Sequence, residues 1–125
     1  MIDIRMRWNE EDCWINIKGH AQYAPLGKDI VCASISTLYE NLIDSLVSLS
    51  GCFIEDYDDI EETRIHISMV DLAAGVLINS FRLGCINISE QYKDNVRYRD
   101  FKGKSAPLWM VVFTPLFQNY PLFTP

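Results

Sequence analysis

Residues 29–51 read Asp29-Ile-Val-Cys-Ala-Ser-Ile-Ser-Thr-Leu-Tyr-Glu-Asn-Leu-Ile-Asp-Ser-Leu-Val-Ser-Leu-Ser-Gly51. Within this run, apolar residues recur every three or four positions, which is the spacing of one stripe of an amphipathic helix. The stripe consists of Val31, Ile35, Leu38, Leu42, Leu46 and Leu49. Asp29 is a favourable N-cap and Ser50-Gly51 a favourable stop, so the pattern predicts a helix over residues 30–49.

Two stretches before this helix alternate between apolar and polar side chains, as half-buried strands do. They cover residues 2–8 and 13–18, with a polar turn between them. Alternation on both sides of a short turn predicts an antiparallel hairpin. Residues 19–28 contain two glycines and one proline and show no periodicity, so we expect a long loop there.

The same arrangement returns after the helix. Residues 52–57 and 63–69 are predicted strands around an acidic turn. Asp71 can cap a second helix that ends near Tyr92, and residues 96–99 allow a fifth short strand. The order β-β-α-β-β-α predicts an α+β fold, a two-layer sandwich in which an antiparallel sheet carries both helices on one face.

The composition limits the kinds of partner. The chain has 125 residues, 17 of them acidic and 11 basic, for a net charge of −6. Affinity for a phosphate backbone comes from clustered lysine and arginine, so we expect no direct nucleic-acid partner. The two histidines and four cysteines show no zinc-site spacing, and we expect neither a metal nor a cofactor.

The chain divides by composition near residue 100. Residues 1–100 have the make-up of one globular domain, whereas residues 101–125 form an apolar extension with four prolines. Three interpretations of the extension stay open: a poorly ordered tail, a strap on a dimer partner, or a peptide that lies in the active-site groove.

Acidic and basic residues alternate from the N-terminus onward, so we expect no signal peptide. The most apolar stretch, residues 106–117, contains two prolines and is shorter than the ~20 residues of a membrane span, so we expect no membrane partner. In a chain without an export signal, four widely spaced cysteines indicate free thiols and a cytoplasmic location.

Cys32 and His20 are the candidates for chemistry. Cys32 lies in the first turn of the predicted helix, where unpaired amides and the positive end of the helix dipole favour a thiolate. The loop from residue 19 can bring His20 beside the sulfur, and a base next to a thiolate is the minimum for acyl transfer. From spacing alone, two other interpretations remain open: Cys32 as a small core residue, and His20 as a loop histidine bonded to a backbone carbonyl.

The run Gly19-His-Ala21, followed by a short glycine-containing loop and by Asp29-Ile-Val-Cys-Ala-x-x-Ser36, resembles the Prp family of bacterial ribosomal-processing cysteine proteases. The resemblance covers roughly residues 1–100. It implies a β-β-α-β-β-α fold, a homodimer and a cysteine endopeptidase. Such an enzyme removes the N-terminal extension of a large-subunit ribosomal protein, or processes virion proteins when a phage encodes it.

The resemblance also implies roles for five residues. Cys32 matches the nucleophile and His20 the general base, while the supporting positions are Gly19, Asp29 and Ser36. The loop residues Tyr23-Ala-Pro-Leu26 depart from the family pattern, which more often has a polar or acidic residue there.

Two further alternatives stay open. Residues 55–62 contain six acids, which form either a solvated hairpin tip or a patch that attracts a basic peptide. The rival to the protease is a non-catalytic, dimeric peptide- or ribosome-binding module of the same fold, in which Cys32 belongs to the core.

Overall fold

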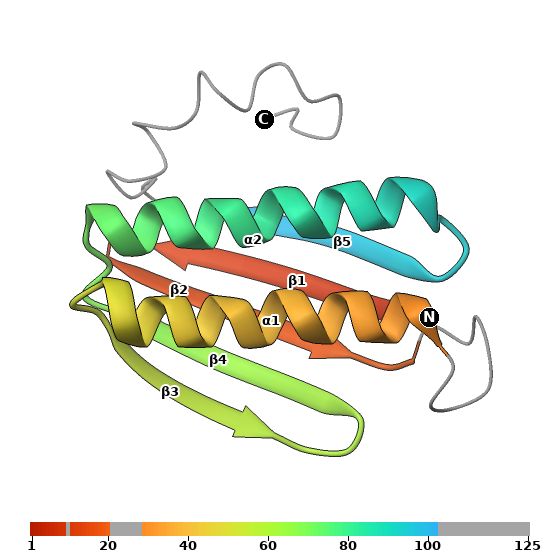
Figure 1. Cartoon of the computed structure of the whole chain (residues 1–125), viewed down its shortest axis with the longest axis horizontal. Helices are drawn as coiled ribbons and strands as arrows, with labels where there is room; N and C mark the ends of the chain where they lie inside the picture. Colours follow the sequence, from red (N-terminus) through yellow and green to blue (C-terminus); the bar gives the residue numbers. More distant parts are fainter. Residues whose placement is uncertain (10, 21–28, 103–125) are drawn as a thin grey trace.

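The computed structural model describes residues 1–9, 11–20 and 29–102. The elements follow the chain as β1 (Ile2–Asn9), β2 (Asp12–Lys18), α1 (Ile30–Leu49), β3 (Phe53–Asp58), β4 (Glu62–Ser68), α2 (Leu72–Gln91) and β5 (Val96–Lys102). The strands form one sheet in the order β3-β4-β2-β1-β5, and both helices lie on the same side of it (Figure 1). The predicted fold class, an α+β two-layer sandwich, is confirmed.

One pairing in the sheet differs from the predicted antiparallel arrangement. The β1–β2, β2–β4 and β3–β4 pairs are antiparallel, but β5 lies parallel to β1, with Ile2 opposite Val96. The reason is the path of α2, which carries the chain back along the sheet before β5 begins (Figure 1). The sheet is therefore mixed, and β5 runs to Lys102, three residues beyond the predicted strand.

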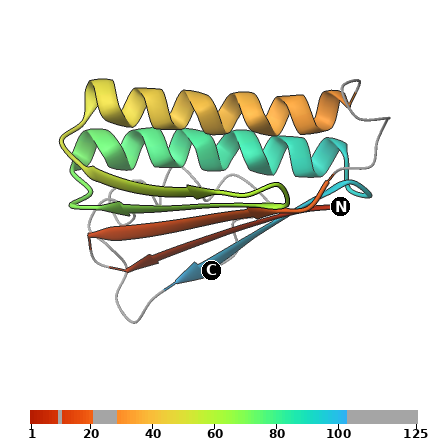
Figure 2. The same cartoon turned by 90° about the horizontal axis from the view of Figure 1, so that it is seen from below.

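The core lies between the sheet and the helices, as the edge-on view shows (Figure 2). Alternate residues of the strands point into this layer and are fully buried: Ile4, Met6, Trp8, Cys13, Ile15, Ile65 and Ile67. The helices contribute Val31, Ile35, Leu42, Leu46, Ala74, Ile78, Phe81 and Cys85. No described element covers the opposite face of the sheet.

Both helices begin and end where the sequence predicts. Asp29 caps α1 and Asp71 caps α2, each through side-chain acceptance of backbone N–H groups of the first turn. The buried face of α2 runs through Ala74, Ile78 and Phe81, whereas Leu72 in its first turn is 63% exposed.

Both helices also satisfy the length and composition of a membrane span, with a mean hydropathy of 1.3. Core helices of globular domains share these properties. Here each helix packs one side against the sheet, and the two helices contact each other.

A buried ion pair joins β5 to α2. Arg82, which is 2% exposed, donates to Asp100 over 2.6 Å, and its guanidinium lies 4.6 Å from the centre of the Trp8 ring. Tyr98 donates its hydroxyl proton to the same carboxylate over 2.6 Å. A buried charge is stable only when it is paired, so this cluster fixes the last strand against the helix layer.

Candidate active site

The candidate residues lie at one end of the molecule. The end of β2, the start of α1 and the β3–β4 turn meet there (Figure 1). The Gly19 N–H donates to the backbone carbonyl of Glu61 over 2.9 Å, which ties the residue after β2 to the acidic turn.

Gly19 occupies a position that accepts only glycine. Its φ of +93° lies in the left-handed region, which other residues adopt at a cost. A Cβ atom at this position would overlap the backbone carbonyl oxygen of Met1. The chain therefore makes a turn at Gly19 that directs it from the sheet toward residue 20.

His20 is the last described residue before the loop, and its side chain is exposed. The loop residues 21–28 lie outside the described part of the chain, and so does the departure from the family pattern at residues 23–26. The end of β2, which precedes His20 by two residues, and the start of α1 lie at the same end of the molecule (Figure 1). No hydrogen bond or ion pair joins the His20 side chain to another described residue.

Cys32 is the third residue of α1. Its side chain is partly buried and packs against the core, at the edge of the buried stripe that includes Val31. The Asp29 carboxylate oxygen Oδ1 accepts from the backbone N–H of Val31 and from that of Cys32, both over 3.0 Å. Asp29 thus has the capping role predicted for it, and it occupies the amide of the candidate nucleophile itself.

Ser36 lies one helical turn beyond Cys32 and is exposed. Its hydroxyl makes no hydrogen bond within the described residues. The neighbouring hydroxyls of Ser34 and Thr37 instead donate to carbonyls of the preceding turn, over 2.7 and 2.9 Å. Within the described ranges, Gly19 and Asp29 have hydrogen bonds that fit a supporting role.

The three other cysteines differ from Cys32. None of the four cysteines, all of which lie in the described ranges, forms a disulfide. Cys13 and Cys85 are fully buried, and desolvation raises the pKa of both thiols far above the usual value. Cys52 is partly exposed, with its sulfur 3.0 Å from the Ser50 hydroxyl oxygen. In the described ranges, no group of three or more histidine, cysteine, aspartate or glutamate side chains is arranged to hold a metal ion.

The acidic turn lies close to the candidate residues. Asp58, Asp59 and Glu61 are exposed at the tip of the β3–β4 hairpin, and the carbonyl of Glu61 is bonded to Gly19. The sequence pattern could not place this tip, because its position depends on the pairing of β2 with β4.

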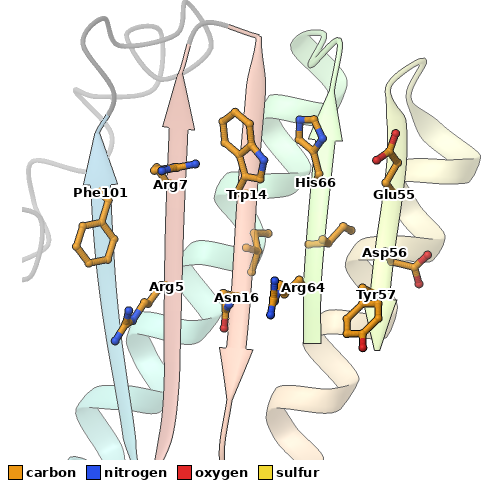
Figure 3. A pocket seen from close by; sticks show the side chains of 12 residues that line it. Arg5, Arg7, Trp14, Asn16, Glu55, Asp56, Tyr57, Arg64, His66 and Phe101 are labelled. Atoms are coloured by element: carbon orange, nitrogen blue, oxygen red, sulfur yellow. The ribbon is translucent and has the colours of Figure 1, made fainter. Parts of the chain in front are cut away.

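Sequence reasoning missed a row of side chains on the open face of the sheet. His66 belongs to this row, and the centre of its ring lies 4.7 Å from that of Trp14, with the two ring planes nearly parallel. The two residues are directly opposite each other on β2 and β4 (Figure 3). Strand alternation gives the face of each residue, whereas the partner follows only from the register.

The sequence matches a known family along most of its length. The family described as "Cysteine protease Prp" matches residues 1–97. The ribosomal processing cysteine protease Prp of Staphylococcus aureus is 27% identical over 103 residues, which cover 78% of this chain and 96% of that protein.

Solved structures share the fold. A crystal structure of the essential ribosomal processing protease Prp from S. aureus, in complex with a covalently linked product peptide, superposes with a TM-score of 0.69 and 24% identity. The superposition covers 80% of this chain and 99% of that one. SMU.848 from Streptococcus mutans gives a TM-score of 0.66 and 26% identity, covering 82% of this chain and 96% of that one.

Proposed function

This chain belongs to the Prp family of cysteine proteases, and we propose that it removes the basic N-terminal extension of a bacterial large-subunit ribosomal protein. In a phage-encoded member, the same activity would act on virion proteins. The observation that carries the proposal is the position of Cys32, three residues after the Asp29 cap of α1, whose start lies at the same end of the molecule as the end of β2 that leads to His20.

In this proposal, Cys32 is the nucleophile and His20 the general base. His20 accepts the thiol proton, and the thiolate attacks the carbonyl carbon of the scissile bond. The tetrahedral intermediate collapses to a thioester as the C–N bond breaks, and His20 returns the proton to the leaving amine. Water, deprotonated by His20, then cleaves the thioester, which releases the acid product and restores the thiol.

Three residues would support this chemistry. Gly19 directs the chain toward His20, Asp29 holds the first turn of α1, and Ser36 presents its hydroxyl one turn beyond the sulfur. Because Asp29 engages the amides of Val31 and Cys32, an oxyanion at this helix start is bound either by the Ile30 N–H or after Asp29 releases one amide.

The neighbouring acidic tip supports a basic substrate. A carboxylate-rich turn beside the site attracts a positively charged peptide. We further propose that the enzyme acts as a homodimer in the bacterial cytoplasm, where ribosomal proteins are made. Analytical ultracentrifugation of the full chain tests the dimer.

The decisive experiment is cleavage of a peptide that carries the N-terminal extension of a candidate ribosomal protein. We expect Cys32→Ala and His20→Ala each to abolish cleavage while the thermal unfolding midpoint stays close to that of the wild type, because nucleophile and base act as a unit. Cys52→Ala is the matched control, since Cys52 is also a partly buried free thiol, and it should cleave normally. A Cys32→Ser variant that cleaves at the wild-type rate would contradict the thiolate mechanism.

The rates of cysteine alkylation distinguish between two hypotheses, a protease and a non-catalytic binding module of the same fold. With a small iodoacetamide reagent near neutral pH, we expect Cys32 to react fastest. Cys13 and Cys85 should react slowest, because burial raises their pKa and keeps them as protonated thiols. Equal, slow rates for Cys32 and Cys52 would favour the binding module.

A further inference from the structure

The open face of the sheet carries one row of side chains that crosses all five strands. From β5 to β3, the strand register places Phe101, Arg7, Trp14, His66 and Glu55 in line. Figure 3 looks onto this face and shows the Trp14 and His66 side chains next to each other on neighbouring strands. No described element covers the row.

Three neighbours in this row are in contact. The Trp14 and His66 ring planes differ by 2°, and the guanidinium carbon of Arg7 lies 4.9 Å from the centre of the Trp14 ring. The Asp12 carboxylate, 2.9 Å from His66 Nε2, holds the imidazole in place. No described carboxylate pairs with Arg7, so its charge is available to a ligand.

Positive charge gathers on the same face although the whole chain is acidic. By register, six of the 11 basic residues lie there, against four acidic ones. The basic residues are Arg5, Arg7, Lys18, Arg64, Arg97 and Arg99, and the acidic residues are Asp3, Asp12, Glu55 and Glu62. Glu62 pairs with Arg64 over 3.0 Å. Asp3 alone is paired with three of them, at 3.0 Å from Arg5, 3.5 Å from Arg97 and 2.9 Å from Arg99. One carboxylate among three guanidinium groups leaves the β1–β5 side of the face cationic.

The row also borders a hollow of about 620 Å³. Arg5, Arg7, Trp14, Arg64 and His66 line it, and Glu55 and Asp56 close it on the β3 side (Figure 3). This volume is in the range of sites that hold a small organic ligand. The carboxylates on the β3 side repel anions, so a negatively charged ligand is confined to β2, β1 and β5.

We propose that this face binds single-stranded RNA. Phe101 is 42% exposed, and the Trp14 and His66 rings are partly exposed. Unpaired bases stack on aromatic rings of an open sheet, and arginines beside the rings contact the phosphates. The net charge of the chain led to the expectation of no nucleic-acid partner. Net charge is a sum over the whole surface, however, and it does not show that positive and negative side chains lie on different parts of that surface. The choice of RNA over DNA rests on the proposed function, because a ribosomal substrate is surrounded by RNA.

The test is the binding of a fluorescently labelled oligouridine of about 12 nucleotides to the full chain, followed by anisotropy at low salt. We expect Trp14→Leu to weaken binding at least about 10-fold, whereas Trp14→Phe, which keeps a ring, retains most of it. Arg7→Gln should weaken binding and reduce its salt dependence, because one phosphate contact is lost. Lys93→Gln is the matched control, since it removes one exposed charge from the turn after α2 and should bind like the wild type.

Several outcomes of this binding experiment would contradict the proposal or assign the face to a different ligand. No binding of the oligouridine, or equal weakening by Lys93→Gln and Arg7→Gln, would overturn the proposal. So would equal affinity for oligothymidine DNA, or preferred binding of an oligoglutamate peptide that depends on Trp14. Dissociation of a dimer by Trp14→Leu would assign the face to a second copy of the chain. Because binding is measured without cleavage, its failure is distinct from failure of the protease proposal.

Discussion

At Asp29, a single carboxylate oxygen accepts the amide hydrogens of Val31 and Cys32. This carboxylate therefore has two effects. It satisfies two backbone donors that would otherwise be unpaired at the helix start, and it places a negative charge beside the candidate nucleophile. Stability and reactivity are coupled at this residue, and substitutions can separate them.

Asp29→Ala should lower the free energy of unfolding by about 1 kcal/mol, because both amides lose their acceptor. Asp29→Asn retains a side-chain oxygen and should lie within a few tenths of a kcal/mol of the wild type. Urea denaturation measures both, and alkylation of Cys32 reports the first turn. We expect slower alkylation only in the alanine variant, since the frayed turn no longer fixes the sulfur. Asp44→Ala, on the exposed side of α1, is the control.

At the scale of elements, the end of α1 and the start of α2 share one side chain. Asp71 accepts from the Ala74 N–H over 2.8 Å and from the Gly51 N–H over 2.9 Å. These bonds, the one from Ala74 foremost, hold the pKa of the Asp71 carboxyl below its usual value. The link between the two helix ends is therefore sensitive to acid.

A lowered pKa in the folded state fixes the sign of the pH dependence. The stabilisation by ionised Asp71 is present above its unfolded pKa of about 3.9 and is lost as the pH falls through the lower folded value. The thermal midpoint of Asp71→Asn should therefore approach that of the wild type as the pH falls from about 6 to about 3. Asp44→Asn should show no such convergence, and a constant difference for Asp71→Asn would contradict the linkage.

The ion pair between Arg82 of α2 and Asp100 of β5 leads to a second prediction at the scale of elements. Arg82→Met should lower the free energy of unfolding by about 3 kcal/mol, because the partly buried Asp100 carboxylate loses its ion-pair partner and keeps only the Tyr98 hydroxyl. Arg97→Met is the same substitution on β5, at a side chain that is 54% exposed, and should cost less than about 1 kcal/mol. Chemical denaturation measures both, and similar losses would mean that the pair contributes little.

For the whole molecule, the distribution of charge matters more than its sum. The acidic tip lies beside the candidate site, while the cations lie on the open face of the sheet. If the tip guides a basic peptide, the double variant Asp59→Lys/Glu61→Lys should raise KM several-fold with little change in kcat. The effect should fade at high salt, because screening shortens the reach of exposed charges to about 10 Å or less.

The control for the acidic tip is Glu40→Lys/Asp44→Lys, which reverses two exposed charges on α1. It should leave KM close to the wild-type value at every salt concentration. A KM that rises equally in both double variants would indicate an effect of net charge alone. A KM unchanged in the tip variant would mean that the tip is only solvated.

The sequence predicted the elements well, because local signals define them. The Asp29 and Asp71 caps placed both helix starts, and alternation identified the strands. Whatever depended on pairing between distant strands escaped prediction: the parallel β1–β5 pair, the contact of His66 with Trp14 and the Gly19–Glu61 bond. At the site, the roles of Cys32 and His20 stay predictions, whereas the capping by Asp29 is confirmed.

The parallel pair of β1 with β5 also constrains the order in which the chain can fold during synthesis. β1 is the first strand to be made, and β2 can pair with it at once. The other edge of β1 pairs with residues 96–102, which are made much later. A nascent chain therefore exposes unpaired backbone groups of β1 until most of the domain has left the ribosome. A chain released before residue 96 would keep that edge open, and strand-to-strand aggregation would be its expected fate.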